Sequence, residues 1–240
     1  MENQPEPIDL NNKTADFVIL AVKGALGAIP FVGSLLAELA GTVIPNQRED
    51  RIVRFAQLLE ERIIKLEQDY VRSQLNNEYF CDLFEEGVRQ ASRSLSDERR
   101  IYIANLITNS LEQPDIEYIE SKHLMRMLNE LNDIEIIWLR FYINPGMSGD
   151  DEFRNAHKEL LTPIRATHSS PKNAIDKEAL QDSYKDHLTQ LGLLRPQYKV
   201  DNMTKLPKFN SHTGNQELNG HEITPLGRLL LKQIGLVDFD

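Results

Sequence analysis

The feature that most constrains the fold is a regular spacing of apolar residues between residues 49 and 75. The apolar positions advance by three or four residues, and the charged residues between them fall mostly on the other face. These apolar positions are Ile52, Phe55, Leu59, Ile63, Leu66 and Tyr70. The pattern predicts one long amphipathic helix over 49–75, whose apolar stripe must be buried against other elements.

Further helical segments follow this one. A helix is predicted to begin near Asn77, and another after Ser96, whose side chain can cap the free amides of the first turn. Pro114 ends that helix. The region 117–142 is again helical, with a break expected at Asn132–Asp133.

These patterns predict a mainly α protein whose first part is a helical bundle spanning 15–145, because each helix needs neighbours to cover its stripe. Residues 1–14 are polar, contain two prolines and show no apolar period, so we expect a flexible tail there.

An apolar segment at 17–45 is predicted to form a helical hairpin within the first part. Only Lys23 and Glu38 are charged in it, and Pro30 interrupts a continuous helix. Each arm would have about 14 residues and measure roughly 20 Å, short of the roughly 30 Å needed to cross a bilayer core. Its candidate membrane or assembly residues are Phe17, Val18, Leu20, Leu26, Ile29, Phe31, Val32, Leu35, Leu36 and Leu39.

Three interpretations of this hairpin stay open. Gly24, Gly27, Gly33 and Gly41 would allow helix backbones to approach closely, as they do in tightly packed hairpins and in helices that associate in lipid. The hairpin is therefore either part of the bundle core, an element that leaves the bundle and enters a membrane, or a surface for self-association.

The last part of the chain predicts a small α+β module over 150–240. Residues 173–191 fit a helix that ends at Gly192, and a polar insertion separates two short strands. Thr224 can then cap a final helix with Pro225 in its first turn. This order of helix, strand, wing, strand and helix is typical of a winged-helix module. A turn at Asn144-Pro145-Gly146 predicts the boundary before it.

Charge divides the chain at about the same place. The net charge is −10, and the residues from Asp151 onward carry 12 basic and 12 acidic side chains, so the first 150 residues hold the whole excess. Such an acidic part should repel nucleic acid. A single cysteine, Cys81, excludes an internal disulfide framework and a zinc site built from several cysteines.

No catalytic constellation is present in the sequence. The chain has no Walker A loop, dinucleotide glycine fingerprint, HExxH or GxSxG motif. The best fragments are Asp82, Glu85 and Glu86, and the pair His221-Glu222, all of which we interpret as solvated or capping groups. We therefore predict a non-enzyme with no catalytic residue, metal site, cofactor or small-molecule substrate.

Two stretches carry a resemblance to a known family. Residues 78–111 read EYFCDLFEEGVRQASRSLSDERRIYIANLITNSL, and the chain later reads LTQLGLL at 188–194 and ITPLGRLLL at 223–231. This combination resembles bacterial helical proteins of the abortive-infection alpha type, which end in a winged-helix tail. The resemblance covers about 78–111 and 180–231, and it departs at the long wing, 195–222, and at 17–45. It implies a bacterial, phage-defence-associated protein without established catalytic residues.

We therefore expect a non-catalytic bacterial defence or stress-response protein that contacts a protein partner or itself. The 17–45 hairpin would be its effector or oligomerisation element, and the protein would be cytoplasmic, with recruitment to the inner face of the membrane if that hairpin enters lipid.

The alternative is a DNA-binding regulator that uses the C-terminal module. Seven basic side chains would meet phosphates, namely Lys172, Lys177, Lys185, Arg195, Lys199, Lys205 and Lys208. Asp176, Glu178, Asp182 and Asp186 lie on the same predicted helix and weigh against this interpretation.

Overall fold

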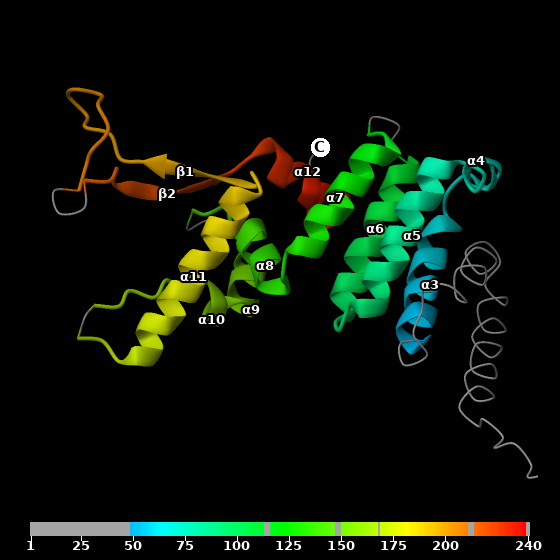
Figure 1. Cartoon of the computed structure of the whole chain (residues 1–240), viewed down its shortest axis with the longest axis horizontal. Helices are drawn as coiled ribbons and strands as arrows, with labels where there is room; N and C mark the ends of the chain where they lie inside the picture. The colour runs from blue at the N-terminus through cyan, green and yellow to red at the C-terminus, as the bar shows by residue number, and fades with distance from the viewer. Residues whose placement is uncertain (1–48, 113–115, 147–149, 168, 211–213, 239–240) are drawn as a thin grey trace, which may run out of the picture. The chain divides into compact units, whose positions relative to one another are not determined.

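A computed structural model describes residues 49–112, 116–146, 150–167, 169–210 and 214–238 (Figure 1). Within these residues the chain forms ten helices and two strands, which confirms the mainly α class predicted from the sequence. The predicted tail and the apolar hairpin at 17–45, with all ten of its candidate residues, lie outside the described residues.

The first of two compact units comprises the described residues up to Arg126 together with Gln233–Gly235. It contains α3 (Glu49–Ile63), α4 (Gln68–Gln74), α5 (Glu78–Arg93), α6 (Asp97–Glu112) and most of α7 (Tyr118–Glu130). Each of α3, α5 and α6 contacts the other two, so these three helices form a helical bundle (Figure 1).

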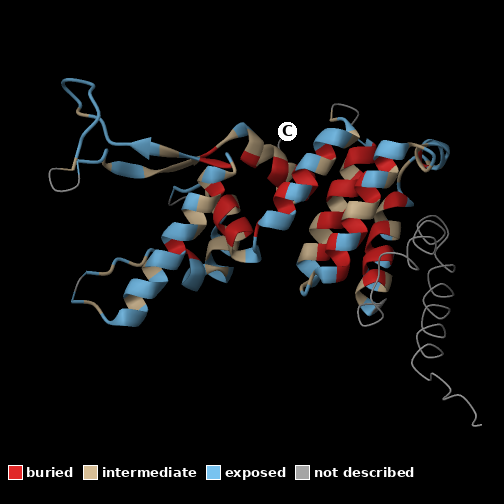
Figure 2. Ribbon diagram, viewed as in Figure 1, coloured by how far each residue is buried: buried red, intermediate tan, exposed pale blue. Residues whose placement is uncertain are grey.

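The apolar stripes predicted from the sequence form the core of this bundle. Phe55, Leu59, Phe80 and Ile103 are at most 1% exposed. Figure 2 shows many buried residues on the helices of this bundle. Burying one such side chain contributes roughly 1.5–3 kcal/mol. At Gly87, a Cβ atom would lie 2.7 Å from Ile107 Cδ1, so the absence of a side chain allows α5 to approach α6 closely.

The long helix expected over 49–75 is interrupted. It ends at Ile63, and α4 begins after a turn, with Glu67 as N-cap accepting bonds from the amides of Asp69 and Tyr70. The side-chain amide of Gln68 donates to the carbonyl of Ile63, at the end of α3, and to the carbonyl of Leu66, in the turn that follows. Side-chain caps therefore compete with continuation of the helix, a feature that the apolar period alone does not reveal.

Three other predicted helix boundaries are confirmed, while Pro114 lies outside the described residues. Asn77 caps α5, and Ser96 accepts a bond from the amide of Arg99 at the start of α6. The predicted break after α7 is a capping box, in which Asn132 and Glu135 each bond the backbone amide of the other.

The second unit comprises the described residues of 127–232 and 236–240. It contains α8 (Asp133–Phe141), α9 (Asp151–Ala156), α10 (Lys158–Leu161), α11 (Lys172–Gln190), β1 (Leu194–Tyr198), β2 (Leu218–Ile223) and most of α12 (Pro225–Gln233). Both α10 and α11 pack on α8, and β1 packs on α11. The turn Asn144-Pro145-Gly146, at which we expected a boundary, lies inside this unit.

Gly192 and Thr224 fix the junction between α11, the strands and α12. Gly192 has a φ of 72° and ends α11, while the Leu193 amide donates to the Leu188 carbonyl, which is the pattern of a Schellman cap. The Thr224 hydroxyl then donates to the Gly192 carbonyl and accepts from the amide of Gly227 in α12. The order of helix, strand, strand and helix thus agrees with the sequence analysis, while the winged-helix assignment stays a prediction.

The strands pair in antiparallel fashion, with Leu194 opposite Ile223 and Tyr198 opposite Leu218. A bulge near Gln197 and Tyr198 shifts the register. Leu194 and Ile223 are buried at the base of the sheet, where they contribute to the core of the second unit.

The resemblance motif in α6 has a structural role in the first unit. The side-chain amides of Asn105 and Asn109 donate to the carbonyls of Ile234 and Gln233, each at 2.9 Å. Arg62 in turn donates to Asn105. These two asparagines therefore hold the segment Gln233–Gly235 against α6, although about 125 residues separate the two in sequence.

Candidate interaction surface

Three of the seven basic candidates in the C-terminal module are paired with carboxylates. Lys185 lies 3.1 Å from Asp182, and its ammonium nitrogen is 5.2 Å from the centre of the Trp138 ring. Arg195 donates two bonds to Glu222, at 2.9 and 3.0 Å, and Lys199 lies 3.3 Å from Glu217. In the part of the chain that the structure describes, Lys172, Lys177, Lys205 and Lys208 form no ion pair.

The long insertion predicted as a wing extends the sheet, and we name residues 198–210 and 214–218 the β-arm. The Lys199 amide donates to the Glu217 carbonyl, the Lys208 amide to the Lys199 carbonyl, and the Glu217 amide to the Lys208 carbonyl. Bridges between Val200 and Pro207 and between Phe209 and Gln216 complete the pairing. The β-arm is thus an ordered antiparallel structure with three neighbouring segments.

An Asp201-capped turn closes one end of the β-arm. The Asp201 carboxylate accepts bonds from the amides of Met203 and Thr204, both at 2.9 Å, and these bonds hold the pKa of Asp201 below its usual range. Lys205 has a φ of 58°, a left-handed conformation that the turn requires.

Six large apolar side chains of the β-arm are exposed to solvent. Figure 2 shows that this arm consists mainly of exposed residues. The exposed fractions are 46% for Tyr198, 48% for Leu218, 50% for Val200, 60% for Phe209, 64% for Leu206 and 94% for Met203. Such a concentration of exposed apolar side chains in one short segment is typical of a contact surface.

This surface was not predicted from the sequence, because the insertion is rich in Asn, Lys, Pro and Gly and therefore indicates a polar segment. The available signal was local alternation, in which Tyr198 and Val200 flank Lys199, and Pro207 and Phe209 flank Lys208.

A groove of about 470 Å³ lies beside the β-arm. One stripe of α11 lines it with Glu178, Gln181, Asp182, Lys185 and Asp186. Pro163–Arg165, Tyr142 and Leu218–His221 supply the rest of the lining. Gln181 is buried and bonds the backbone of Leu160, Thr162 and Ile164, so it ties the segment before α11 to this helix.

Two ring side chains of the groove have shifted pKa values. Burial, followed by the nearby Asp182 carboxylate, raises the pKa of Tyr142 to about 12. The His221 ring packs against Tyr142 at 5.8 Å between ring centres, and burial lowers the pKa of His221, with Lys185 adding to the effect. His221 is therefore predominantly neutral at neutral pH.

The adjacent residues His221 and Glu222 do not act on each other. Neighbouring strand residues point to opposite faces. Glu222 bonds Gln197 and Arg195, which lower its pKa, whereas His221 packs on Tyr142. The pair therefore belongs to two different environments.

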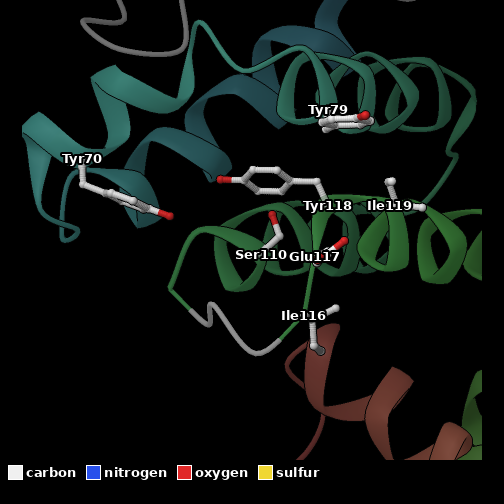
Figure 3. Close-up of a pocket in the computed structure, with 7 residues that line it drawn as sticks. All are labelled: Tyr70, Tyr79, Ser110, Ile116, Glu117, Tyr118 and Ile119. Atoms are coloured by element: carbon white, nitrogen blue, oxygen red, sulfur yellow. The ribbon is translucent and has the colours of Figure 1, made fainter.

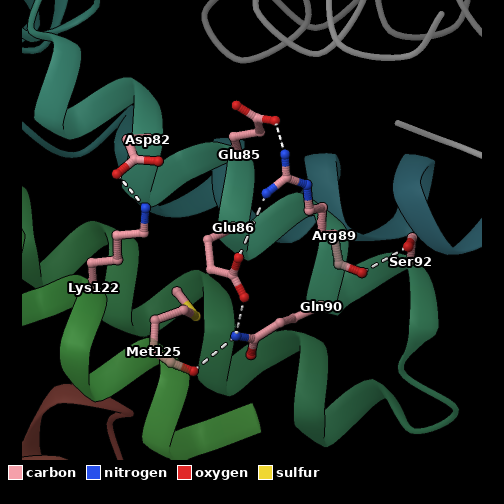
Figure 4. Close-up of polar contacts among 8 residues, drawn as sticks. All are labelled: Asp82, Glu85, Glu86, Arg89, Gln90, Ser92, Lys122 and Met125. Atoms are coloured by element: carbon pink, nitrogen blue, oxygen red, sulfur yellow. Dashed lines mark hydrogen bonds and ion pairs between the residues drawn. The ribbon is translucent and has the colours of Figure 1, made fainter. Parts of the chain in front are cut away.

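The three α5 carboxylates singled out in the sequence, Asp82, Glu85 and Glu86, form ion pairs within the first unit. Figure 4 shows Asp82 paired with Lys122 and Glu85 paired with Arg89. Glu86 lies 3.8 Å from Arg89 and accepts a bond from Gln90, which also donates to the Met125 carbonyl. These contacts join α5 to α7 and neutralise the carboxylates.

A second pocket, in the first unit, has a volume of about 360 Å³ and is lined partly by tyrosines (Figure 3). Tyr118 donates to Gln74 at 2.8 Å, and burial raises its pKa. Tyr70, which we expected on a buried stripe, is 42% exposed, and Tyr79 is 60% exposed; both line this pocket. They are surface residues because α4 and the first turn of α5 lie at the edge of the bundle core.

The described residues contain no group of three or more His, Cys, Asp or Glu side chains that could hold a metal ion. Among the same residues, no helix has both the length and the apolar character to span a membrane. No family model, curated protein or solved structure matches the chain.

Proposed function

We propose that the chain is a non-catalytic bacterial defence or stress-response protein that acts by contacting a protein partner through its C-terminal module. The single observation that carries the proposal is the exposed apolar surface of the β-arm, with six side chains that are 46–94% exposed. The resemblance of residues 78–111 and 180–231 to abortive-infection alpha proteins supports the biological setting.

The energetics of apolar burial favour this use of the β-arm. Burying an exposed aromatic or aliphatic side chain contributes roughly 1.5–3 kcal/mol, and a few such residues supply most of the binding energy at a typical interface. Phe209, Leu206 and Met203 are the most exposed of the six and are the expected anchors. The hairpin at 17–45 remains the proposed effector or self-association element.

The test is a phage challenge of bacteria that express the full chain. We expect the wild type to reduce plaque formation and a Leu206→Glu/Phe209→Glu variant to lose this protection. Leu95→Glu is the matched control, because Leu95 is 86% exposed but belongs to the first unit. Full protection by the β-arm variant would refute the role of this surface, and no protection by the folded wild type against any tested phage would refute the defence role.

DNA binding through the same module is the second candidate, and the four lysines without ion pairs favour it. Each phosphate contact would give a slope of about −0.9 in the logarithm of the binding constant against the logarithm of salt concentration. We would measure duplex binding over a salt series for the wild type and for Lys205→Ala/Lys208→Ala. A wild-type affinity that does not depend on salt, or an unchanged slope in the variant, would contradict this candidate.

A further inference from the structure

We infer that the partner of the C-terminal module is a protein segment that is both apolar and cationic, and that it docks between the β-arm and the acidic stripe of α11. This inference rests on the proposed protein contact and adds the chemistry of the partner. Three observations support it: the β-arm has one apolar face and one charged face, a groove lies beside it, and charged side chains line this groove.

Four of the six exposed apolar residues of the β-arm lie on one face. Directly paired residues of antiparallel strands point to the same side, and so do residues two apart along a strand. Tyr198 pairs with Leu218, Val200 with Pro207, and Phe209 with Gln216. Because each of these pairs is two residues from the next, the apolar side chains of Tyr198, Val200, Phe209 and Leu218 occupy a single face, together with Pro207.

The opposite face of the β-arm is charged. Lys199, Lys208 and Glu217 alternate with the apolar set and are joined to one another by backbone bonds, and Lys199 pairs with Glu217. An antiparallel sheet with one charged and one apolar face usually buries the apolar face. On the β-arm this face is exposed, although it continues directly from the buried pair Leu194 and Ile223.

The apolar face runs into the groove. Leu218 belongs to that face and also lines the groove, together with the following residues up to His221. On the α11 side, Glu178, Asp182 and Asp186 are spaced four residues apart and therefore follow one stripe of the helix. A docked segment would touch apolar side chains and carboxylates at the same time.

The charges of the groove select a cationic occupant. Three carboxylates line it against Arg165 and Lys185, and Lys185 is already paired with Asp182. Glu178 and Asp186 form no ion pair within the described ranges. Phosphates of DNA would be repelled by these carboxylates, whereas lysine or arginine side chains would be attracted.

The chain itself does not supply a suitable occupant. Residues 1–48 contain five acidic residues (Glu2, Glu6, Asp9, Asp16 and Glu38) against Lys13, Lys23 and Arg48, and the whole chain has a net charge of −10. An acidic segment, or a second copy with this charge, would meet repulsion at the groove. The occupant is therefore a different protein.

The test measures binding of a short fluorescent peptide of alternating lysine and leucine to the full-length protein by fluorescence anisotropy. One comparison peptide has glutamate in place of lysine, and another has serine in place of leucine. We expect saturable binding of the lysine–leucine peptide, with at least about tenfold weaker binding of both comparison peptides.

Two variants address the two sides of the site. Val200→Ser/Phe209→Ser changes the apolar face, and Glu178→Lys/Asp186→Lys reverses charge in the groove, while circular dichroism checks that each variant folds. Both should weaken binding by about tenfold or more. Leu95→Ser and Glu130→Lys are the matched controls, because both side chains are exposed and lie outside the groove.

Equal binding of the glutamate or serine peptide would overturn the inference, as would full binding by folded variants of the groove or no binding by the wild type. The phage assay keeps this outcome separate from the proposed function. If β-arm variants lose protection but the peptide does not bind, the contact surface stands and the cationic partner is wrong. If they keep protection, the proposed function fails whatever the peptide does.

Discussion

Replacing Gly227 by alanine tests how closely α12 must approach the end of α11. A Cβ atom at this position would lie 2.9 Å from Ile223 Cγ1 and 3.3 Å from Leu139 Cδ1, and closer still to the carbonyl oxygen of Leu193. Optimal carbon–carbon contacts are about 3.5–4.0 Å, so the new methyl group would overlap its neighbours. The backbone oxygen cannot move aside as a flexible side chain would.

Two opposing effects decide the size of the change. Alanine is favoured over glycine in a helix by about 1 kcal/mol. Overpacking costs about 1–3 kcal/mol, and a shift of α12 would weaken the bond from the Thr224 amide to the Leu193 carbonyl, worth about 0.5–1.5 kcal/mol. The net expectation is a loss of about 1–3 kcal/mol in the free energy of unfolding.

Urea unfolding followed by tryptophan fluorescence measures this loss. Trp138 is the only tryptophan of the chain, and it is 3% exposed in the same unit as Gly227. With a urea slope of about 2 kcal/mol/M, the midpoint should fall by about 0.5–1.5 M. Gly146→Ala is the control, because its Cβ would meet nothing closer than Asn144 Oδ1 at 3.7 Å. A Gly227→Ala protein as stable as the wild type would refute the steric argument.

Two further predictions concern the other polar contacts. Asn105→Ala should destabilise the docking of Gln233–Gly235 by about 1–3 kcal/mol, because the Ile234 carbonyl and the Nε atom of Arg62 lose their partner. Hydrogen exchange should then be faster at the C-terminal residues, with Asn129→Ala as an exposed control. Unchanged exchange would contradict the assignment. His221→Phe should flatten the dependence of stability on pH below the ordinary histidine pKa of 6.5. Because burial lowers the pKa of His221 in the folded state, the unfolded chain binds the proton first as pH falls. The wild type therefore loses stability as pH falls through 6.5. Identical losses in melting temperature for the two proteins between pH 7.5 and 5.5 would show that His221 is not responsible.

The sequence by itself determined most of the helices and their ends. Apolar spacing placed α3, α5, α6 and α7, because each helix has a stripe that water disfavours. Capping chemistry placed the boundaries at Ser96 and Thr224, because a side-chain oxygen next to free amides acts locally. These signals depend on residues within a few positions of one another, so they can be interpreted without the fold.

The candidate surface was predicted only in part. The seven basic residues lie on α11, on β1 and in the β-arm, and their pairing depends on contacts across the sheet, such as Arg195 with Glu222. The apolar face of the β-arm also requires the register of three segments, which short alternating stretches do not fix.

Only the tertiary structure decided the long-range contacts. Asn105 and Asn109 could be recognised in a motif, but their bonds to the carbonyls of Ile234 and Gln233 cross about 125 residues. Likewise, the requirement for glycine at 227 follows from the Leu193 carbonyl, which reaches this position only after α11 and the strands have packed. Local chemistry thus specified the helices, while the close approach of distant backbone groups specified which polar and small residues the fold needs.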